Sequence, residues 1–255
     1  MKPQDESWSR AAAFYEREFV DPFLPDIKNP LHAALRTFRK KGARVVADLG
    51  CGLGPLLPFL AQRFDNVYAV DFAAGMLERA REKCAGFANV EFLQRSLLDL
   101  APLVGRLDVA VSVNSLVMPS VVDQEKSLRE ICRCLKPGGH LIGILPAMDG
   151  VHYQTMLLLD RALDRGMPMT AARKNAASNN DLELYDLGFG QFRFQGLEQH
   201  FWQPFEIDYR LSRCGFRLVR RRKVHLSWKQ FQGSDTLKKH PPPWDWFFVA
   251  TPSEG

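Results

Sequence analysis

The sequence predicts a doubly wound α/β fold, in which helices cover both faces of a mostly parallel β-sheet. Short, continuous apolar runs alternate through residues 44–146 with segments whose apolar residues recur every three or four positions. Continuous apolar runs are typical of strands buried on both faces, and the helical segments between them supply the right-handed crossovers that parallel strands require. The glycine cluster "GCGLG" at 50–54 follows the first run and indicates backbone that needs positive φ or the close approach of a ligand.

Strands and helices follow one another in this alternating segment. We expect strands at 44–49, 66–71, 90–96, 107–114 and 140–146. The helical patterns between them lie at 55–64, 73–84 and 123–135. "KPGG" at 136–139 is expected to stop the last of these helices, because proline cannot continue a helix and glycine can cap one.

Other parts of the chain stand outside this alternation. Residues 7–40 are predicted to form two helices separated by the proline-rich "DPFLPDIKNP". Residues 147–203 are expected to hold a helix near 152–165, then the polar link "ARKNAASNND" and the aromatic "LYDLGFGQFRFQ". After them we expect a helix in "PFEIDYRLSRCGF" and strands in "FRLVRRRKV" and "WDWFFVAT".

The composition is typical of a soluble, globular, cytoplasmic protein. Of the 255 residues 46% are hydrophobic and 25% are charged, and no apolar run approaches the ~20 residues of a membrane helix. The N-terminus "MKPQDESWSR" has no apolar stretch that would make it a signal peptide. The five cysteines favour reduced thiols, and Cys132 and Cys134 have no second ligand pair at zinc spacing. We therefore expect no membrane span and no metal site.

The glycine loop and the end of the next strand predict a ligand site. Ligands bind beyond the carboxyl ends of parallel strands, where Gly50, Gly52 and Gly54 follow the first strand and Asp71 ends the second. The spacing G-x-G-x-G, followed by a proline suited to the first turn of a helix, does not match a dinucleotide fingerprint. Asp48 adds negative potential beside the loop. A ligand with positive groups therefore fits this site better than a pyrophosphate does.

The motifs "ADLGCGLG", "VYAVD", "QRSLLDL", "LDVAVSVNSL" and "CLKPGGHLIGIL" stand in this order along the chain. In these motifs the sequence resembles the class I S-adenosylmethionine-dependent methyltransferases, from about residue 43 to 146 and more weakly to 251. The resemblance implies a seven-stranded, Rossmann-like sheet with an antiparallel last strand and a helical, aromatic cap. It also implies one domain with an N-terminal helical cap (1–42), a cofactor-binding core (43–146), an acceptor insertion (147–203) and a C-terminal part of the sheet (204–255).

The resemblance also implies S-adenosyl-L-methionine as cofactor and S-adenosyl-L-homocysteine as product. Asp71 corresponds to the acidic residue that holds the ribose. Ser96, which stands where the family usually has aspartate, would accept a hydrogen bond from the adenine amino group, and Leu97 would offer its backbone N–H to the ring. The implied cofactor-binding residues are Asp48, Gly50, Cys51, Gly52, Gly54, Asp71, Phe72, Met76, Ser96, Leu97, Asn114 and Ser115.

The methyl acceptor is expected to bind among the N-terminal helices and residues 147–203. These segments are rich in aromatic side chains and histidines, which suit a largely apolar pocket: Trp8, Phe14, Tyr15, His152, Tyr153, Tyr185, Phe189, Phe192, Phe194, His200 and Trp202. A base is needed only if the acceptor must lose a proton, and the catalytic candidates are His152, His200 and Tyr15.

A small-molecule acceptor is the leading hypothesis, because the cap is long, aromatic and not strongly basic. Methylation of a protein or RNA, or a non-catalytic cofactor-binding role, remains the alternative. Nucleic acid is not indicated, since the net charge is only +5 and "NSLVMP" lacks an N-P-P-[YF] strand end. The basic run 220–223 would alternate between the two faces of an edge strand. The oligomeric state stays open.

Overall fold

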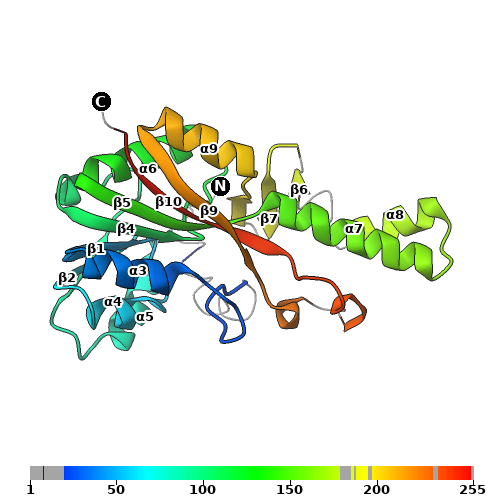
Figure 1. The fold of residues 1–255 in the computed structure, drawn as a ribbon, viewed down its shortest axis with the longest axis horizontal. Coiled ribbons are helices and arrows are strands. Elements are labelled where there is room, and N and C mark those ends of the chain that lie inside the picture. The colour runs from blue at the N-terminus through cyan, green and yellow to red at the C-terminus, as the bar shows by residue number, and fades with distance from the viewer. Residues whose placement is uncertain are drawn as a thin grey trace.

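The computed structural model describes residues 8, 20–178, 185–186, 188–194, 197–231 and 235–253. Its centre is a seven-stranded sheet with the order β3-β2-β1-β4-β5-β10-β9 (Figure 1). The strands are β1 (Val45–Leu49), β2 (Asn66–Asp71), β3 (Val90–Gln94), β4 (Leu107–Val113), β5 (Leu135–Pro146), β9 (Phe216–His225) and β10 (Trp244–Pro252). The predicted doubly wound, Rossmann-like fold is therefore confirmed.

The first five strands are parallel, and the last strand reverses direction. β1 pairs with β2 and β4, β2 with β3, and β4 with β5, all in parallel. β10 inserts antiparallel between β5 and β9, which leaves β9 at one edge of the sheet. The predicted antiparallel last strand is confirmed, and its amino end lies at the edge where the parallel strands have their carboxyl ends.

Helices cover both faces of this sheet. One apolar cluster joins the strands to α3 (Leu31–Lys40), α4 (Leu57–Ala61) and α5 (Ala74–Lys83). The opposite cluster joins them to α6 (Val121–Cys134) and α9 (Pro204–Arg213). Glu125 of α6 fastens these last two helices together, because its carboxylate accepts hydrogen bonds from Arg210 and Arg213 of α9. Apolar side chains on both faces of the sheet thus have helices to pack against.

Most elements begin or end within three residues of the expected positions, and two of the differences affect the interpretation of the sequence. Helix α4 begins at Leu57, so Pro55 precedes it instead of standing in its first turn. Strand β5 begins at Leu135, directly after α6, and includes the "KPGG" segment that was expected to be a turn. Here Leu107 pairs with Leu135 and Val109 with His140, so the ladder shifts register across the segment. Gly138, with φ of 76°, allows the irregularity.

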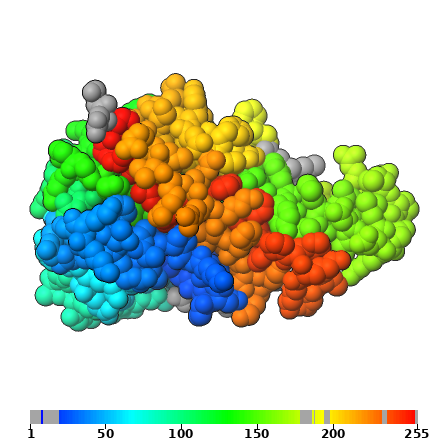
Figure 2. Space-filling view, in the orientation of Figure 1, coloured from blue at the N-terminus to red at the C-terminus, as the bar shows by residue number. Residues whose placement is uncertain are grey.

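The segment after β5 forms the cap. It contains α7 (Met148–Asp164), α8 (Met169–Ser178) and the small sheet of β6 (Tyr185–Asp186), β7 (Gln191–Phe194) and β8 (Leu197–His200). The predicted polar link is helical through Ser178, because Ala172 and Ala176 lie one turn apart and are both buried. Helices α7 and α8 project from the sheet as a hairpin, visible in Figures 1 and 2.

The N-terminal expectation is met in part. The second predicted helix is α3, which ends at Lys40. The helix predicted before the proline-rich segment lies outside the described residues, apart from Trp8. Within the described part of the chain, no helix is long and apolar enough to cross a membrane.

Candidate functional site

Three neighbouring cavities lie where the parallel strands end and β10 begins. The central cavity, of about 590 Å³, is bounded by the loops after β1, β2, β3 and β4. The loop cavity, of about 340 Å³, lies between the glycine loop and residues 20–23. The cap cavity, of about 220 Å³, lies between the cap and the start of β10. Asn114, directly after β4, lines all three.

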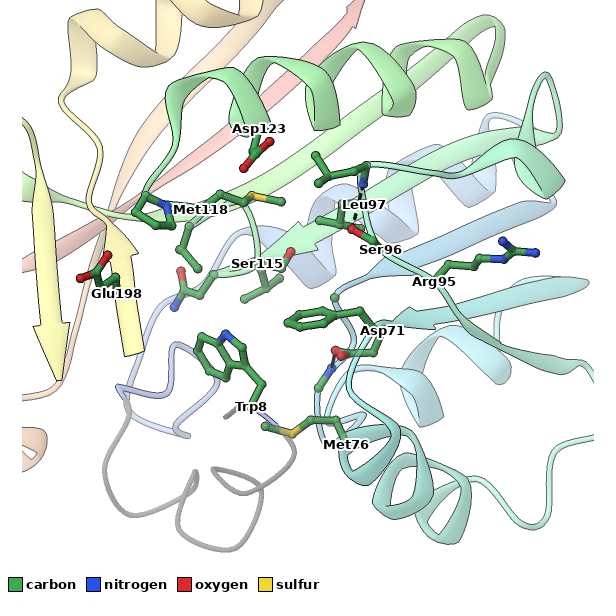
Figure 3. A pocket seen from close by; sticks show the side chains of 18 residues that line it. Trp8, Asp71, Met76, Arg95, Ser96, Leu97, Ser115, Met118, Asp123 and Glu198 are labelled. Atoms are coloured by element: carbon green, nitrogen blue, oxygen red, sulfur yellow. Dashed lines mark hydrogen bonds between the residues drawn. The ribbon is translucent and has the colours of Figure 1, made fainter. Parts of the chain in front are cut away.

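The central cavity brings together most of the residues that the sequence implied for a cofactor. These are Gly50, Gly52, Asp71, Phe72, Met76, Ser96, Leu97, Asn114 and Ser115. In Figure 3, Ser96 and Leu97 lie above Asp71 and Met76, and Trp8 lies to the left of Asp71. Asp48 and Cys51 line the loop cavity instead. Gly54 lines none of the three.

Each glycine of the loop has its own reason to lack a side chain. All three have positive φ, between 53° and 73°. A Cβ on Gly50 would collide with Ser115, and one on Gly54 would press on Leu57 and Ala80, so both glycines serve packing. A Cβ on Gly52 would meet nothing within 4 Å. Gly52 is therefore the position where bare backbone faces open space in the cavity.

Asp71 holds the glycine loop in place. Its side chain is 7% exposed, and its two oxygens accept hydrogen bonds from the backbone N–H groups of Gly52 and Ala73, both at 2.9 Å. Burial raises the pKa of this carboxyl, and the backbone hydrogen bonds oppose that rise. A carboxylate has about four lone-pair positions. Asp71 can therefore hold the loop and still accept hydrogen bonds from a ligand.

Asp48 lies behind the loop as a second buried carboxyl. Burial, and next the negative charge of Asp71, raise the pKa of Asp48 to about 7. Cys51 lies in the same surroundings, and burial raises the pKa of its thiol. A thiol with a raised pKa is a poor nucleophile at neutral pH. The surroundings of Cys51 therefore do not favour thiolate chemistry at this position.

The loop after β4 contains a conformation that few residues adopt. Asn114 has φ of 50°, and it is the one non-glycine residue with positive φ in the part of the chain that the structure describes. Asparagine tolerates the left-handed region better than most residues. Ser115 then donates a hydrogen bond from its hydroxyl to the carbonyl of Leu49, which ties this loop to β1. Such backbone strain is typical of functional sites.

The cap cavity has aromatic walls and a few buried polar groups. Trp8 and Phe192 are the members of the predicted aromatic set that line this cavity. The sequence analysis missed its other principal lining residues: Gln154, Gln199, Phe201, Leu226, Phe231, Trp244 and Asp245. One signal could have found Asp245, namely a carboxylate between two tryptophans in an otherwise apolar strand. Such a residue is buried at a cost and therefore suggests a function.

The two histidines among the predicted base candidates do not line these cavities. His200 is 3% exposed, and its Nε2 lies 2.9 Å from Glu206 Oε2 in α9. His152 lies on α7, and neither histidine lines any of the three cavities. The third candidate, Tyr15, lies outside the described residues, as do Phe14 and the side chains of Tyr185 and Phe194.

The remaining predicted aromatic residues have other surroundings. The indole N–H of Trp202 donates to the carbonyl of Leu116 in the core. The Tyr153 hydroxyl donates to the carbonyl of Pro241, 3.0 Å away. Phe189 is 76% exposed. None of these three lines the cavities described above.

Comparison with known proteins agrees with this geometry. Residues 46–139 match a family described as a methyltransferase domain. The chain is 39% identical over 101 residues to a demethylmenaquinone methyltransferase of Clavibacter sepedonicus, an alignment that covers 40% of each chain. It is 32% identical over 179 residues to a trans-aconitate 2-methyltransferase of Acidovorax sp. strain JS42, covering 69% of this chain and 65% of the relative. The chain spans about half the length of the curated relatives it matches first.

Solved structures share the fold over nearly the whole chain. One is an N-methyltransferase of Bradyrhizobium japonicum in complex with S-adenosyl-L-homocysteine, which covers 98% of each chain with a TM-score of 0.59 and 14% identity. Another is the PH0226 protein of Pyrococcus horikoshii, which covers 94% of this chain and 98% of its own length, with a TM-score of 0.61 and 20% identity. At such identities the likeness concerns the fold.

Proposed function

The core of this chain is a methyltransferase domain of the class I, S-adenosylmethionine-dependent kind, and from this premise we propose that the protein methylates a small-molecule acceptor. The cofactor supplies a methyl group already activated by its sulfonium charge. The protein has to align an acceptor behind that methyl group and exclude water. The observation that carries the proposal is a small aromatic cavity that shares Asn114 with the central cavity.

The residues of the central cavity fit the cofactor. Gly52 leaves room for a ligand to approach its backbone, and Asp71 keeps free lone pairs for the two ribose hydroxyls. Ser96 is exposed at the edge of the cavity, where its hydroxyl can accept a hydrogen bond from an adenine amino group. Asp48 and Asp71 lie beside the loop, and in their ionised forms they favour a ligand that carries positive charge.

The cap cavity is proposed to hold the acceptor. Its volume of about 220 Å³ suits a small molecule or part of one, and its walls include Phe192, Phe201, Phe231 and Trp244. Relatives named for quinone and trans-aconitate methylation also act on small molecules. Methylation of a protein or RNA, and cofactor binding without turnover, are the competing functions.

The proposal is tested in two stages. Isothermal titration should show binding of S-adenosylmethionine and S-adenosylhomocysteine, and the absence of heat and of any thermal shift at millimolar ligand would contradict the cofactor assignment. Labelled-methyl transfer is then measured on a cell metabolite extract, on protein and on RNA. Label in the metabolite fraction supports the proposal. Label in protein or RNA alone, or cofactor binding without transfer to any fraction, favours the competing functions.

A further inference from the structure

Asp245 is a buried carboxylate at the amino end of β10. It pairs with Pro146, the last residue of β5, and its side chain is 5% exposed. The side-chain amide of Asn114 and the backbone N–H of Ala147 lie beside its carboxylate and favour the ionised form. Its Oδ2 atom has no hydrogen-bond partner within the described residues. Because β10 is antiparallel, this residue lies in the cap cavity, at the same edge as the ligand loops.

Two more residues that line the same cavity carry an unsatisfied polar atom. Asn114 Oδ1 and Gln199 Nε2 are buried without a partner in the part of the chain that the structure describes, and both residues line the cap cavity. Buried polar groups are satisfied in most native proteins, so an exception requires an explanation. Two acceptors and one donor around one cavity indicate a ligand that both donates and accepts hydrogen bonds. A hydroxyl group does both.

The cavity also restricts the charge of this ligand. Among the described residues that line it, Asp245 is the one ionisable side chain, and the remaining lining residues are apolar, aromatic or amide-bearing. An anionic acceptor would meet a carboxylate and find no cation. An uncharged, aromatic molecule with a hydroxyl would pair the unsatisfied atoms and pack against Phe192, Phe201 and Phe231.

We propose that Asp245 binds the hydroxyl of an uncharged aromatic acceptor and takes its proton during methyl transfer. This inference rests on the proposed methyltransferase function. A lone pair of the hydroxyl oxygen forms the new O–C bond, while the C–S bond breaks and its electron pair stays on sulfur. The hydroxyl proton passes to Asp245 Oδ2 and then to water. Gln199 donates a hydrogen bond to the same oxygen, and Asn114 holds the carboxylate beside the central cavity.

The protonation behaviour of Asp245 suits this role. Burial raises its pKa to about 7, while the neighbouring Asn114 amide and Ala147 N–H oppose the rise. A base with a pKa near neutral pH accepts a proton effectively. Two charged groups on the neighbouring strand and helix are directed elsewhere. Lys223 of β9 and Asp149 of α7 both contact the side chain of Trp244, which points to the opposite face of β10 from Asp245. His225 pairs with that tryptophan, and Arg222, on the Asp245 face of β9, is exposed.

The test uses 2-naphthol as an uncharged probe and 2-naphthoate as an anionic probe of similar shape. Their binding to the protein saturated with S-adenosylhomocysteine is measured by calorimetry at pH 6 and pH 8. The wild type should bind 2-naphthol about tenfold more tightly at pH 8, since a group with a pKa of about 7 is mostly ionised there. It should bind 2-naphthoate more weakly at both values. Asp245→Asn should remove the pH dependence.

A second variant keeps the test decisive. Gln199→Leu should weaken 2-naphthol binding several-fold and retain the pH dependence, whether or not Asp245→Asn folds well. Absent naphthol binding, equal binding at pH 6 and 8 in the wild type, or unchanged pH dependence in Asp245→Asn would overturn the proposal. Failure to bind S-adenosylhomocysteine at all would instead contradict the proposed function, because the probe experiment begins from that complex.

Discussion

Asn114 shows how much of the site depends on a single residue. Its backbone takes the left-handed conformation, its N–H donates to the carbonyl of Ile144, and its side chain reaches Asp245. The position therefore joins the ends of β4, β5 and β10. A residue with a branched or bulky side chain would be strained there. The three cavities meet at this one asparagine because its short amide can serve neighbours on several sides.

Gly52→Ala should weaken cofactor binding by about tenfold or more, because the added methyl group enters open space that the ligand needs. The substitution also strains the backbone, since φ at Gly52 is 53°. Gly105→Ala is the matched control. Gly105 has φ of 67° and equally open surroundings, but it precedes β4 at the opposite edge of the sheet. Titration calorimetry with S-adenosylhomocysteine checks this, and equal losses in both variants would refute the assignment of Gly52.

Asp48→Asn should stabilise the protein more at pH 8 than at pH 5. The pKa of Asp48 is about 7 in the folded chain against an ordinary value of 3.8, so the folded state holds this proton more tightly than the unfolded state does. The contribution of Asp48 to the free energy of unfolding is fully present below pH 3.8 and is lost as the pH rises to about 7. We expect the variant to gain about 1–3 kcal/mol more at pH 8.

Urea unfolding at the two pH values measures this difference. Asp160→Asn, a change at an exposed position on α7, serves as the control and should alter stability little at either pH. A gain for Asp48→Asn that is the same at pH 5 and pH 8 would mean that the carboxyl is not held neutral by its surroundings.

At the scale of elements, the reversed direction of β10 decides what the cap cavity contains. A parallel strand in that place would bring its carboxyl end to the site and leave Trp244 and Asp245 at the far edge. The antiparallel pairing of Asp245 with Pro146 instead sets the first residues of β10 beside the last residue of β5. The chain after β9 returns past the same edge, where Leu226 and Phe231 also line the cavity.

The cap should be more mobile than the sheet and should close over the acceptor. Helices α7 and α8 pack mainly on each other and project from the body of the molecule (Figure 1). Hydrogen exchange should therefore be faster in α8 than in β4, and ligand should slow exchange in residues 147–178. The measurement compares the protein alone with its S-adenosylhomocysteine complex. Protection equal to that of β4, without change on ligand addition, would argue against a closing cap.

At the scale of the whole molecule, the basic run of β9 is divided between two faces of the sheet edge. Arg221 bonds to Asp208 and lies 5.0 Å from the ring centroid of Trp246, and Lys223 lies 3.2 Å from that of Trp244. Arg220 lies over Phe247 on the other face. Figure 2 shows β9 in orange on the surface of the molecule. Charges on an edge strand discourage pairing with another sheet, which accounts for the run without a ligand.

Arg220→Gln combined with Arg222→Gln should therefore leave RNA retention unchanged at physiological salt. These two positions are chosen because Arg221 and Lys223 hold contacts whose loss would disturb the fold. Filter binding with a random-sequence RNA checks the prediction, and Lys40→Gln with Lys41→Gln at the end of α3 is the matched double control. The prediction would be wrong if the wild type retained RNA and only the Arg220 and Arg222 changes abolished this retention. That result would identify β9 as a nucleic-acid surface.

The sequence by itself determined the fold class, the parallel strands β1 to β5 and the ligand loop. Local sequence patterns predict these features. The observed bounds of β2 equal the predicted ones, and nine of the implied cofactor residues line one cavity. Local patterns act over a few residues, because strand and helix periodicity bury neighbouring side chains on one face. The wrong prediction of a polar link at α8 also has a local cause. The helix propensity of the alanines in α8 exceeds the effect of the polar residues that suggested a link.

Only the tertiary structure decided which residues line the cap cavity. His200 was a base candidate by type, but α9 brings Glu206 to its ring, while Asp245 enters the site because β10 folds back between β5 and β9. Asn114 and Asp245 are far apart in the sequence and interact only once the sheet has formed. The pKa of an aspartate and its access to a ligand depend on burial and on such distant partners, which local sequence patterns do not specify.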